Sequence, residues 1–87
     1  MNHNPLIKEK ERALLARQVL DNPVYIEALT IIKTNLMDTW QTTTMNQQNE
    51  REIVYKMLLA LKTIDNHIKS VMKTGELAEM QLEQSNG

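Results

Sequence analysis

The amino-acid sequence predicts an all-α protein: an antiparallel helical hairpin or a three-helix unit, completed by self-association. Two observations lead to this prediction. The chain of 87 residues contains two glycines and two prolines, so it has few places to turn. A stretch of apolar residues repeats at spacings of three and four, which puts all of them on one stripe of a long helix. The stripe consists of Val54, Met57, Leu61, Ile64, Ile68 and Val71.

Two Asn-Pro pairs mark the starts of the first two predicted helices. In Asn4-Pro5 and Asn22-Pro23 the asparagine side chain can accept a hydrogen bond from an unpaired helix N–H, and proline suits the first helical position. Asp21 and Asn22 both favour a turn, so two helices are preferred over one kinked helix. The predicted helices cover residues 5–20 and 23–40, after a flexible N-terminus at 1–4.

A third and longer helix is predicted from about residue 50 to 73, after a polar connection over residues 41–49. Asn49 and Glu52 have the spacing of a capping box at its start. Gly75 is expected to end the helix, because glycine adopts the left-handed C′ conformation without strain. The helical domain would then cover residues 5–75, followed at 76–87 by an acidic short helix and a disordered end.

The second predicted helix has its own apolar stripe and can therefore pack against the third. This stripe consists of Tyr25, Leu29, Ile32 and Leu36, flanked by Ala28, Ile31 and Trp40. Leu58 and Met72 widen the stripe of the third helix, which then needs more than one neighbour. The first helix can cover part of it, and a second protomer is expected to cover the rest.

Composition argues against several classes of function. The absence of cysteine excludes disulfides and thiolate metal sites. A net charge of −1 and an isoelectric point near 6.1 argue against a general phosphate-binding surface. No apolar run approaches the roughly 20 residues that span a bilayer, and the first residues lack the pattern of a signal peptide. The expectation is a soluble protein kept in the cytoplasm, without membrane contact.

Candidate catalytic and metal-binding residues are few. Glu50, Glu52 and Tyr55 lie near one predicted helix start and could form an acid/base site, but capping carboxylates in water beside a half-buried tyrosine are the preferred interpretation. His67 flanks the stripe and has no second metal ligand three or four residues later. There is no glycine-rich phosphate loop and no nucleophile motif. We therefore expect no enzyme activity, metal or cofactor.

Trp40, the single tryptophan, ends the second predicted helix. It continues the stripe of that helix, so it can pack as a lid over the open end of the hairpin. The alternative is an anchor for a partner protein, because tryptophan is favoured at interface hot spots. The lid is preferred, because a chain this poor in aromatic residues needs their bulk in the core. Trp40 and Tyr55 remain the candidate partner contacts.

Short motifs throughout the chain resemble a group of small helical proteins of tailed bacteriophages. They are Glu11-Arg12-Ala13, Leu20-Asp21-Asn22-Pro23, Trp40-Gln41-Thr42-Thr43, Glu50-Arg51-Glu52, Leu59-Ala60-Leu61 and Thr74-Gly75-Glu76-Leu77-Ala78. The resemblance covers about residues 11–82 and implies a phage origin, a gene among the head and packaging genes, and a role in the virion or its assembly. It transfers no catalytic residue. Thr43-Thr44-Met45-Asn46 replaces the acidic or proline-bearing loop of the pattern, which puts any contact made by that loop in doubt.

Three functional hypotheses follow. The leading one is a non-enzymatic phage structural or assembly protein, such as a capsid-associated, cement or packaging accessory subunit. It would bind itself and a capsid or assembly protein, in the host cytoplasm during assembly and then in the virion. The second is a phage-encoded inhibitor that occludes a host or CRISPR-type protein. The third is a small-terminase-like nucleic-acid accessory. Its one argument is the polar strip of Lys62, Lys69 and Lys73, which acidic residues dilute, so nucleic acid is not the expected partner.

Overall fold

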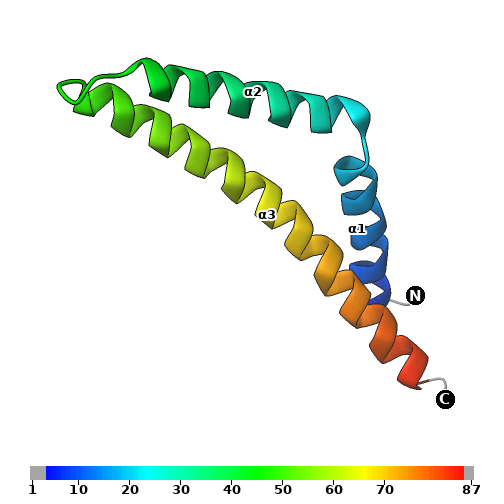
Figure 1. Cartoon of the computed structure of the whole chain (residues 1–87). Helices are drawn as coiled ribbons and strands as arrows, with labels where there is room; N and C mark the ends of the chain where they lie inside the picture. The colour runs from blue at the N-terminus through cyan, green and yellow to red at the C-terminus, as the bar shows by residue number, and fades with distance from the viewer. Residues whose placement is uncertain (1–3, 86–87) are drawn as a thin grey trace.

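The structure, a computed structural model, describes residues 4–85, which form three α-helices (Figure 1). Helix α1 runs over Pro5–Leu20, α2 over Pro23–Thr42 and α3 over Gln48–Ser85. The all-α prediction is confirmed for the described residues. Residues 1–3 and 86–87, which include most of the predicted flexible N-terminus and part of the predicted disordered end, lie outside the described residues.

Both Asn-Pro helix starts are confirmed. The side-chain oxygen of Asn4 accepts a hydrogen bond from the backbone N–H of Leu6 at 2.9 Å. The side-chain oxygen of Asn22 accepts from the N–H groups of Val24 and Tyr25, at 2.8 and 3.2 Å. Each proline then occupies the start of its helix, where its missing N–H leaves no bond unmade. Asp21 and Asn22 therefore separate two helices, as the sequence predicts.

Helix α3 is the spine of the molecule, and α1 and α2 lie along it one after the other. A helix of 38 residues is about 57 Å long, close to the 62 Å length of the whole molecule. Figure 1 shows α2 beside the N-terminal half of α3 and α1 beside its C-terminal half. The other two dimensions are both 23 Å, roughly the width of two packed helices. The fold is thus a long hairpin in which one arm is broken at Asp21–Asn22.

The connection between α2 and α3 is shorter than the predicted one, because α2 continues to Thr42 and α3 begins at Gln48. The hydroxyl of Thr43 donates to the carbonyl of Trp40 at 2.6 Å and closes the end of α2. Gln47 accepts from the N–H of Thr44 through its side-chain oxygen at 2.8 Å, and its carbonyl accepts the hydrogen bond from the Arg51 N–H. Asn49 is therefore inside the first turn, and its prediction as the capping residue is wrong.

The predicted end of the third helix at Gly75 is wrong. Helix α3 continues through Gly75 to Ser85, and Gly75 has no positive φ. A Cβ built on Gly75 would lie 2.5 Å from the Glu9 carbonyl oxygen and even closer to the Ala13 side chain. Glycine is therefore needed here for the close approach of α1, not for a left-handed turn. The predicted boundary between residues 75 and 76 disappears, and the predicted acidic short helix is the last part of α3.

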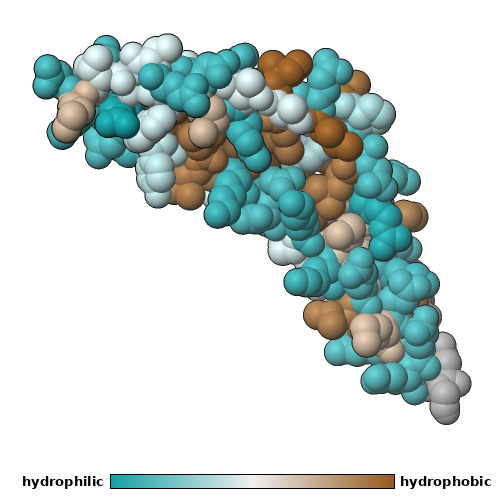
Figure 2. All heavy atoms as spheres, viewed as in Figure 1, coloured by the Kyte–Doolittle hydropathy of each residue, from teal (hydrophilic) through white to brown (hydrophobic). Residues whose placement is uncertain are grey.

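The core is very small for a chain of this length. Among the described residues, the buried apolar side chains are Ala13, Ala16, Val54 and Ala78. The accessible surface is 7077 Å², whereas a compact monomer of 10.1 kDa exposes about 5300 Å². The radius of gyration is 18.7 Å, against about 12 Å expected for a compact chain of 87 residues. Large apolar side chains are therefore left on the surface, in patches along α2 and between α2 and α3 in Figure 2.

Over the described residues, no helix has both the length and the apolar character needed to cross a membrane.

Candidate functional site

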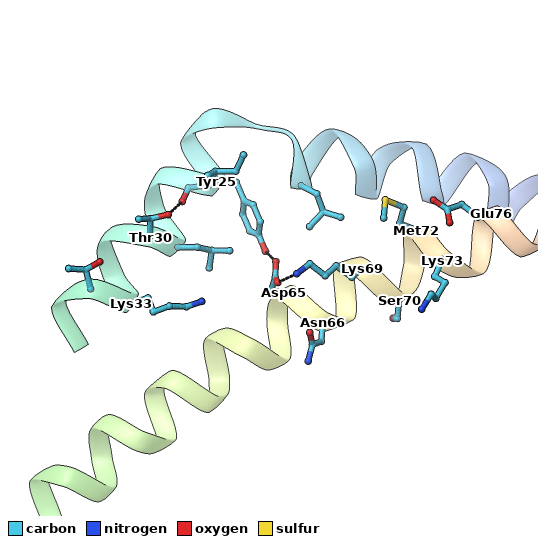
Figure 3. Close-up of a pocket in the computed structure, with 14 residues that line it drawn as sticks. Tyr25, Thr30, Lys33, Asp65, Asn66, Lys69, Ser70, Met72, Lys73 and Glu76 are labelled. Carbon is cyan, nitrogen blue, oxygen red and sulfur yellow. Dashed lines mark hydrogen bonds and ion pairs between the residues drawn. The ribbon is translucent and has the colours of Figure 1, made fainter. Parts of the chain in front are cut away.

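A groove of about 870 Å³ lies between α2 and α3 (Figure 3). Leu29 of α2 and Met72 of α3 contribute apolar surface to its wall, together with Leu20 at the end of α1. Polar residues from both long helices complete the lining, and Figure 3 shows Tyr25 reaching from α2 towards α3. The groove exists because α2 and α3 meet at the loop and diverge towards α1, as Figure 1 shows.

A polar trio joins the two helices across this groove. The Tyr25 hydroxyl donates to Asp65 Oδ1 at 3.2 Å, and Lys69 Nζ lies 2.7 Å from Asp65 Oδ2. Both carboxylate oxygens thus have a partner, one from each helix. The ion pair of Asp65 and Lys69 confirms the helical i,i+4 spacing of these two residues. Asp65 occupies a position on the line of α3 that faces α2, where an apolar residue would otherwise pack.

Near neutral pH each group of the trio keeps its ordinary protonation state, because its contacts shift its pKa away from neutrality. The hydrogen bond from Lys69 is the main cause that holds the pKa of Asp65 below its ordinary value, and Tyr25 and Lys33 act in the same direction. Burial, followed by the hydrogen bond to Asp65, raises the pKa of Tyr25. The hydrogen bond with Asp65 also raises the pKa of Lys69. All three shifts move the groups away from neutral pH, so the trio is suited to connecting helices and poorly suited to transferring protons.

Three lysines line the groove: Lys33 from α2 and Lys69 and Lys73 from α3. Asp65 and Glu76 lie in the same lining, and Glu76 also forms an ion pair with Arg17 at 3.3 Å. The groove therefore has a small excess of positive charge. Lys62, the third member of the predicted polar strip, does not line it.

The predicted stripe of α3 divides into two parts in the structure. Val54 is buried and Leu61 and Ile68 are half-buried, and these three recur every seven residues. Met57 and Ile64 are 51% and 52% exposed, whereas Val71 is half-buried beside α1. A second line of half-buried positions runs through Leu58, Asp65 and Met72, each of which directly follows Met57, Ile64 or Val71 in the sequence. Helices α1 and α2 thus cover one flank of the stripe and leave the other flank largely open.

The open flank continues onto α1 as a shallow apolar groove of about 240 Å³. Leu15, Val19, Ile68 and Val71 line it, with Ala16 at its base. Arg12 and His67 also line the groove, and Arg12 is paired with Glu9 at 3.2 Å. We call Met57, Ile64 and Val71 the seam, and the pocket next to Val71 the seam groove. The seam presents apolar surface from α3, and the seam groove adds apolar surface from α1.

A third hollow, of about 490 Å³, lies at the end of the hairpin beside the loop. Trp40 of α2 and Arg51 and Tyr55 of α3 line it, together with Glu52. The Arg51 guanidinium carbon lies 4.1 Å above the centre of the Trp40 ring, a cation–π contact. Tyr55 is 59% exposed, and Trp40 is half-buried. We call Trp40, Arg51 and Tyr55 the tip patch.

The position of Trp40 is compatible with the predicted lid, and the anchor role stays a prediction. Its ring covers the end of the hairpin against Arg51, as a lid does, yet it also lines an open hollow beside an exposed tyrosine. The two predicted partner contacts, Trp40 and Tyr55, are brought together, although 15 positions of sequence separate them. Of the two predicted acid/base carboxylates, Glu52 lines this hollow and Glu50 does not.

Among the described residues, no group of three or more histidine or carboxylate side chains is placed to hold a metal ion. Sequence reasoning did not identify the contact between Tyr25 and Asp65. The signal for it was a single carboxylate at a position three residues before Ile68 and four after Leu61, on the apolar side of the helix. A charge at such a position needs a partner, and Tyr25 is the first polar group on the facing stripe.

Comparisons of the chain with protein-family profiles, curated proteins and solved structures found no match.

Proposed function

We propose that this protein is a non-enzymatic assembly protein that acts by binding other proteins, including a second copy of itself. The observation that supports this proposal is the surface it leaves exposed: about 1800 Å² more than a compact monomer of its mass. A standard protein interface removes about 800 Å² from each partner. The excess area is therefore sufficient for more than one interface. The motif resemblance is the support for proposing this role in a tailed phage, as a capsid-associated, cement or packaging accessory subunit.

The tip patch is the proposed contact with the partner protein. Tryptophan, tyrosine and arginine are the residue types that most often dominate binding energy at interfaces. Here all three line one hollow at the end of the hairpin farthest from α1 (Figure 1). The Arg51 Nε is buried without a hydrogen-bond partner within the described residues. A partner carbonyl or carboxylate that reached this nitrogen would remove that deficit.

Mass spectrometry of purified phage particles tests the assembly role. A structural subunit is expected in many copies per particle, whereas an inhibitor of a host protein would be absent from particles and recovered with its target. Capture experiments with Tyr55→Ala and Trp40→Ala then test the tip patch. Met45→Ala is the matched control, because Met45 lies in the same loop region, is 84% exposed and does not line the hollow.

The three groove lysines are the observation that favours the nucleic-acid alternative. If Lys33, Lys69 and Lys73 each neutralised one phosphate, the logarithm of the binding constant would fall with a slope of roughly −2.7 against the logarithm of salt concentration. Fluorescence anisotropy with duplex DNA at several salt concentrations measures this slope. A clear slope that Lys33→Gln and Lys73→Gln reduce would replace the assembly proposal by a DNA-binding one.

A further inference from the structure

The seam has the pattern of a helix pair that is missing its second helix. Met57, Ile64 and Val71 recur every seven residues and alternate with Val54, Leu61 and Ile68, which gives the heptad spacing of a coiled coil. In the structure Val54 is buried and Leu61 and Ile68 are half-buried, whereas the N-terminal part of the seam, Met57 and Ile64, stays exposed. Ile64, at its centre, is 52% exposed.

The two ends of the seam have complementary shapes. Near Val71 the surface is hollowed into the seam groove, which Leu15 and Val19 of α1 border. At the other end Met57 is 51% exposed, and methionine is the apolar side chain that adapts most readily to an irregular pocket. Ile64 is seven residues from each of them. A two-fold axis through Ile64 and perpendicular to α3 would therefore bring Met57 of each copy to Val71 of the other.

We infer that a second copy of the chain packs antiparallel against α3 along the seam, with Ile64 near the two-fold axis and Met57 inserted in the seam groove of the other copy. The inference rests on the self-association in the proposed function and specifies its geometry. A parallel pair would put the two α1 helices on the same end and would leave both Met57 side chains outside the grooves. The antiparallel pair fills two grooves at once.

The area and charge of this face favour a second copy as the occupant. A pair along the seam would need to cover about 800 Å² of each chain, which is less than half of the roughly 1800 Å² by which the surface of the whole chain exceeds that of a compact monomer. The seam residues carry no charge, and the seam groove is lined by Arg12, which is already paired with Glu9, and by His67. Two identical copies therefore meet without like-charge repulsion, as a two-fold interface requires.

This arrangement would make the dimer a bridge between two partner molecules. Gln48, at the tip end of α3, is 16 residues from Ile64, which corresponds to about 24 Å along a helix. An antiparallel pair would therefore hold its two tip patches roughly 48 Å apart, at opposite ends and related by the two-fold axis. Such a dimer could bind the same site on two neighbouring subunits of a lattice.

Single-cysteine cross-linking tests the pairing, because the chain contains no cysteine of its own. Ile64→Cys is expected to form a disulfide-linked dimer almost completely under mild oxidation. The matched control is Asn66→Cys, which lies on the α2–α3 groove side and should remain largely monomeric under the same conditions. In sedimentation equilibrium, the unmodified chain should have twice the monomer mass of 10.1 kDa at high micromolar concentration.

The direction of the pair is tested with Met57→Cys and Val71→Cys. An antiparallel seam predicts that each variant alone links poorly and that an equal mixture links into a heterodimer. Efficient linking of each variant alone, with no gain on mixing, would overturn the antiparallel arrangement, and a monomeric wild-type chain would overturn the dimer. Either failure leaves the tip patch testable, because capture through Trp40 and Tyr55 is measured separately from chain mass.

Discussion

Helix α3 binds its two neighbours in different ways. The side of α3 that faces α1 carries Gly75 and Ala78, and the facing side of α1 carries Ala13 and Ala16. Because these residues are small, the two backbones approach closely. Against α2 it presents Asp65 and larger side chains, and the helices separate around a groove of about 870 Å³. The two contacts belong to one continuous helix, yet in one the backbones approach closely at Gly75, whereas the other is open and lined by polar side chains.

The difference shows that the size of the facing residues sets the distance between the helices. Glycine and alanine let backbones approach, as they do wherever helices cross closely, so the short helix α1 is held by close packing over a small area. Ion pairs at the margin add to this contact: Arg17 with Glu76, and Lys10 with Glu79 at 3.7 Å. All four side chains are about half exposed, so these pairs contribute little stability.

The largest expected effect comes from a charge in the close contact. Ile68→Asp would place a carboxylate next to Leu15, Ala16 and Val19, and Arg12, which lines the same groove, is already paired with Glu9; the expected cost is roughly 3–5 kcal/mol. Leu61→Asp, seven residues earlier beside the diverging α2, is expected to cost less because water enters there. Urea unfolding at a fixed protein concentration compares the two variants, and an equal cost would contradict the contrast between the contacts.

A smaller effect is expected from Gly75→Ala. The alanine gains about 1 kcal/mol of helix propensity, but its Cβ meets Ala13 and the Glu9 carbonyl, and overpacking of this kind costs roughly 1–3 kcal/mol. The carbonyl oxygen of Glu9 belongs to the backbone and cannot turn away, so a net loss of up to about 2 kcal/mol is expected. Ala13→Gly in the same chain should restore part of it. A thermal scan that showed Gly75→Ala to be stabilising would mean that α1 is not held at this distance.

In the open contact, Tyr25→Phe removes the hydrogen bond from the Tyr25 hydroxyl to Asp65. We expect a loss of about 1 kcal/mol, since Asp65 keeps Lys69 as a partner and water can reach the free oxygen. Chemical denaturation measures the change. Thr30→Ala is a suitable control, because Thr30 lines the same groove and its hydroxyl bonds only within α2.

The smallest expected effect is a dependence of this contact on pH. The pKa of Asp65 is lowered from 3.8 by its partners, so its contribution to stability is complete above about pH 4 and is lost as the pH falls through the folded-state value. The pKa of Tyr25 is raised from 10.0, so its contribution is present below that value and is lost as the pH rises through the folded-state value. The stability difference between wild type and Tyr25→Phe should therefore shrink at both extremes, and a difference independent of pH would argue against the contact.

The helices could be predicted from the sequence, because their signals are local. The Asn-Pro pairs specify two helix starts through hydrogen bonds within three residues, and both were found where predicted. The end of α3 could not be predicted in the same way, because glycine serves both as a helix terminator and as a point of close approach. One signal favoured the second role: Gly75 continues the seven-residue series of Val54, Leu61 and Ile68, and Leu82 follows it.

The candidate sites were only partly predictable. The stripe of α3 was identified, but the periodicity of one helix does not say which flank its neighbours will cover. Helices α1 and α2 cover the flank that contains Asp65. The apolar pattern argues against that flank, but Tyr25 and Lys69 provide hydrogen-bond partners for the carboxylate there. That compensation depends on a residue 40 positions away and is visible only when the helices are assembled.

The broken arm of the hairpin also has a consequence for the order of folding. Helices α2 and α3 are joined by a short loop, so their contact can form by zipping outward from Thr43–Gln47 at a small cost in loop-closure entropy. Helix α1 is made before α3 but contacts the C-terminal half of α3; the residues of the Arg17–Glu76 pair lie 59 positions apart. During synthesis α1 must therefore wait, with its alanine face exposed, until nearly all of α3 has left the ribosome. The slow step in folding is expected to be the docking of α1 onto the C-terminal half of α3.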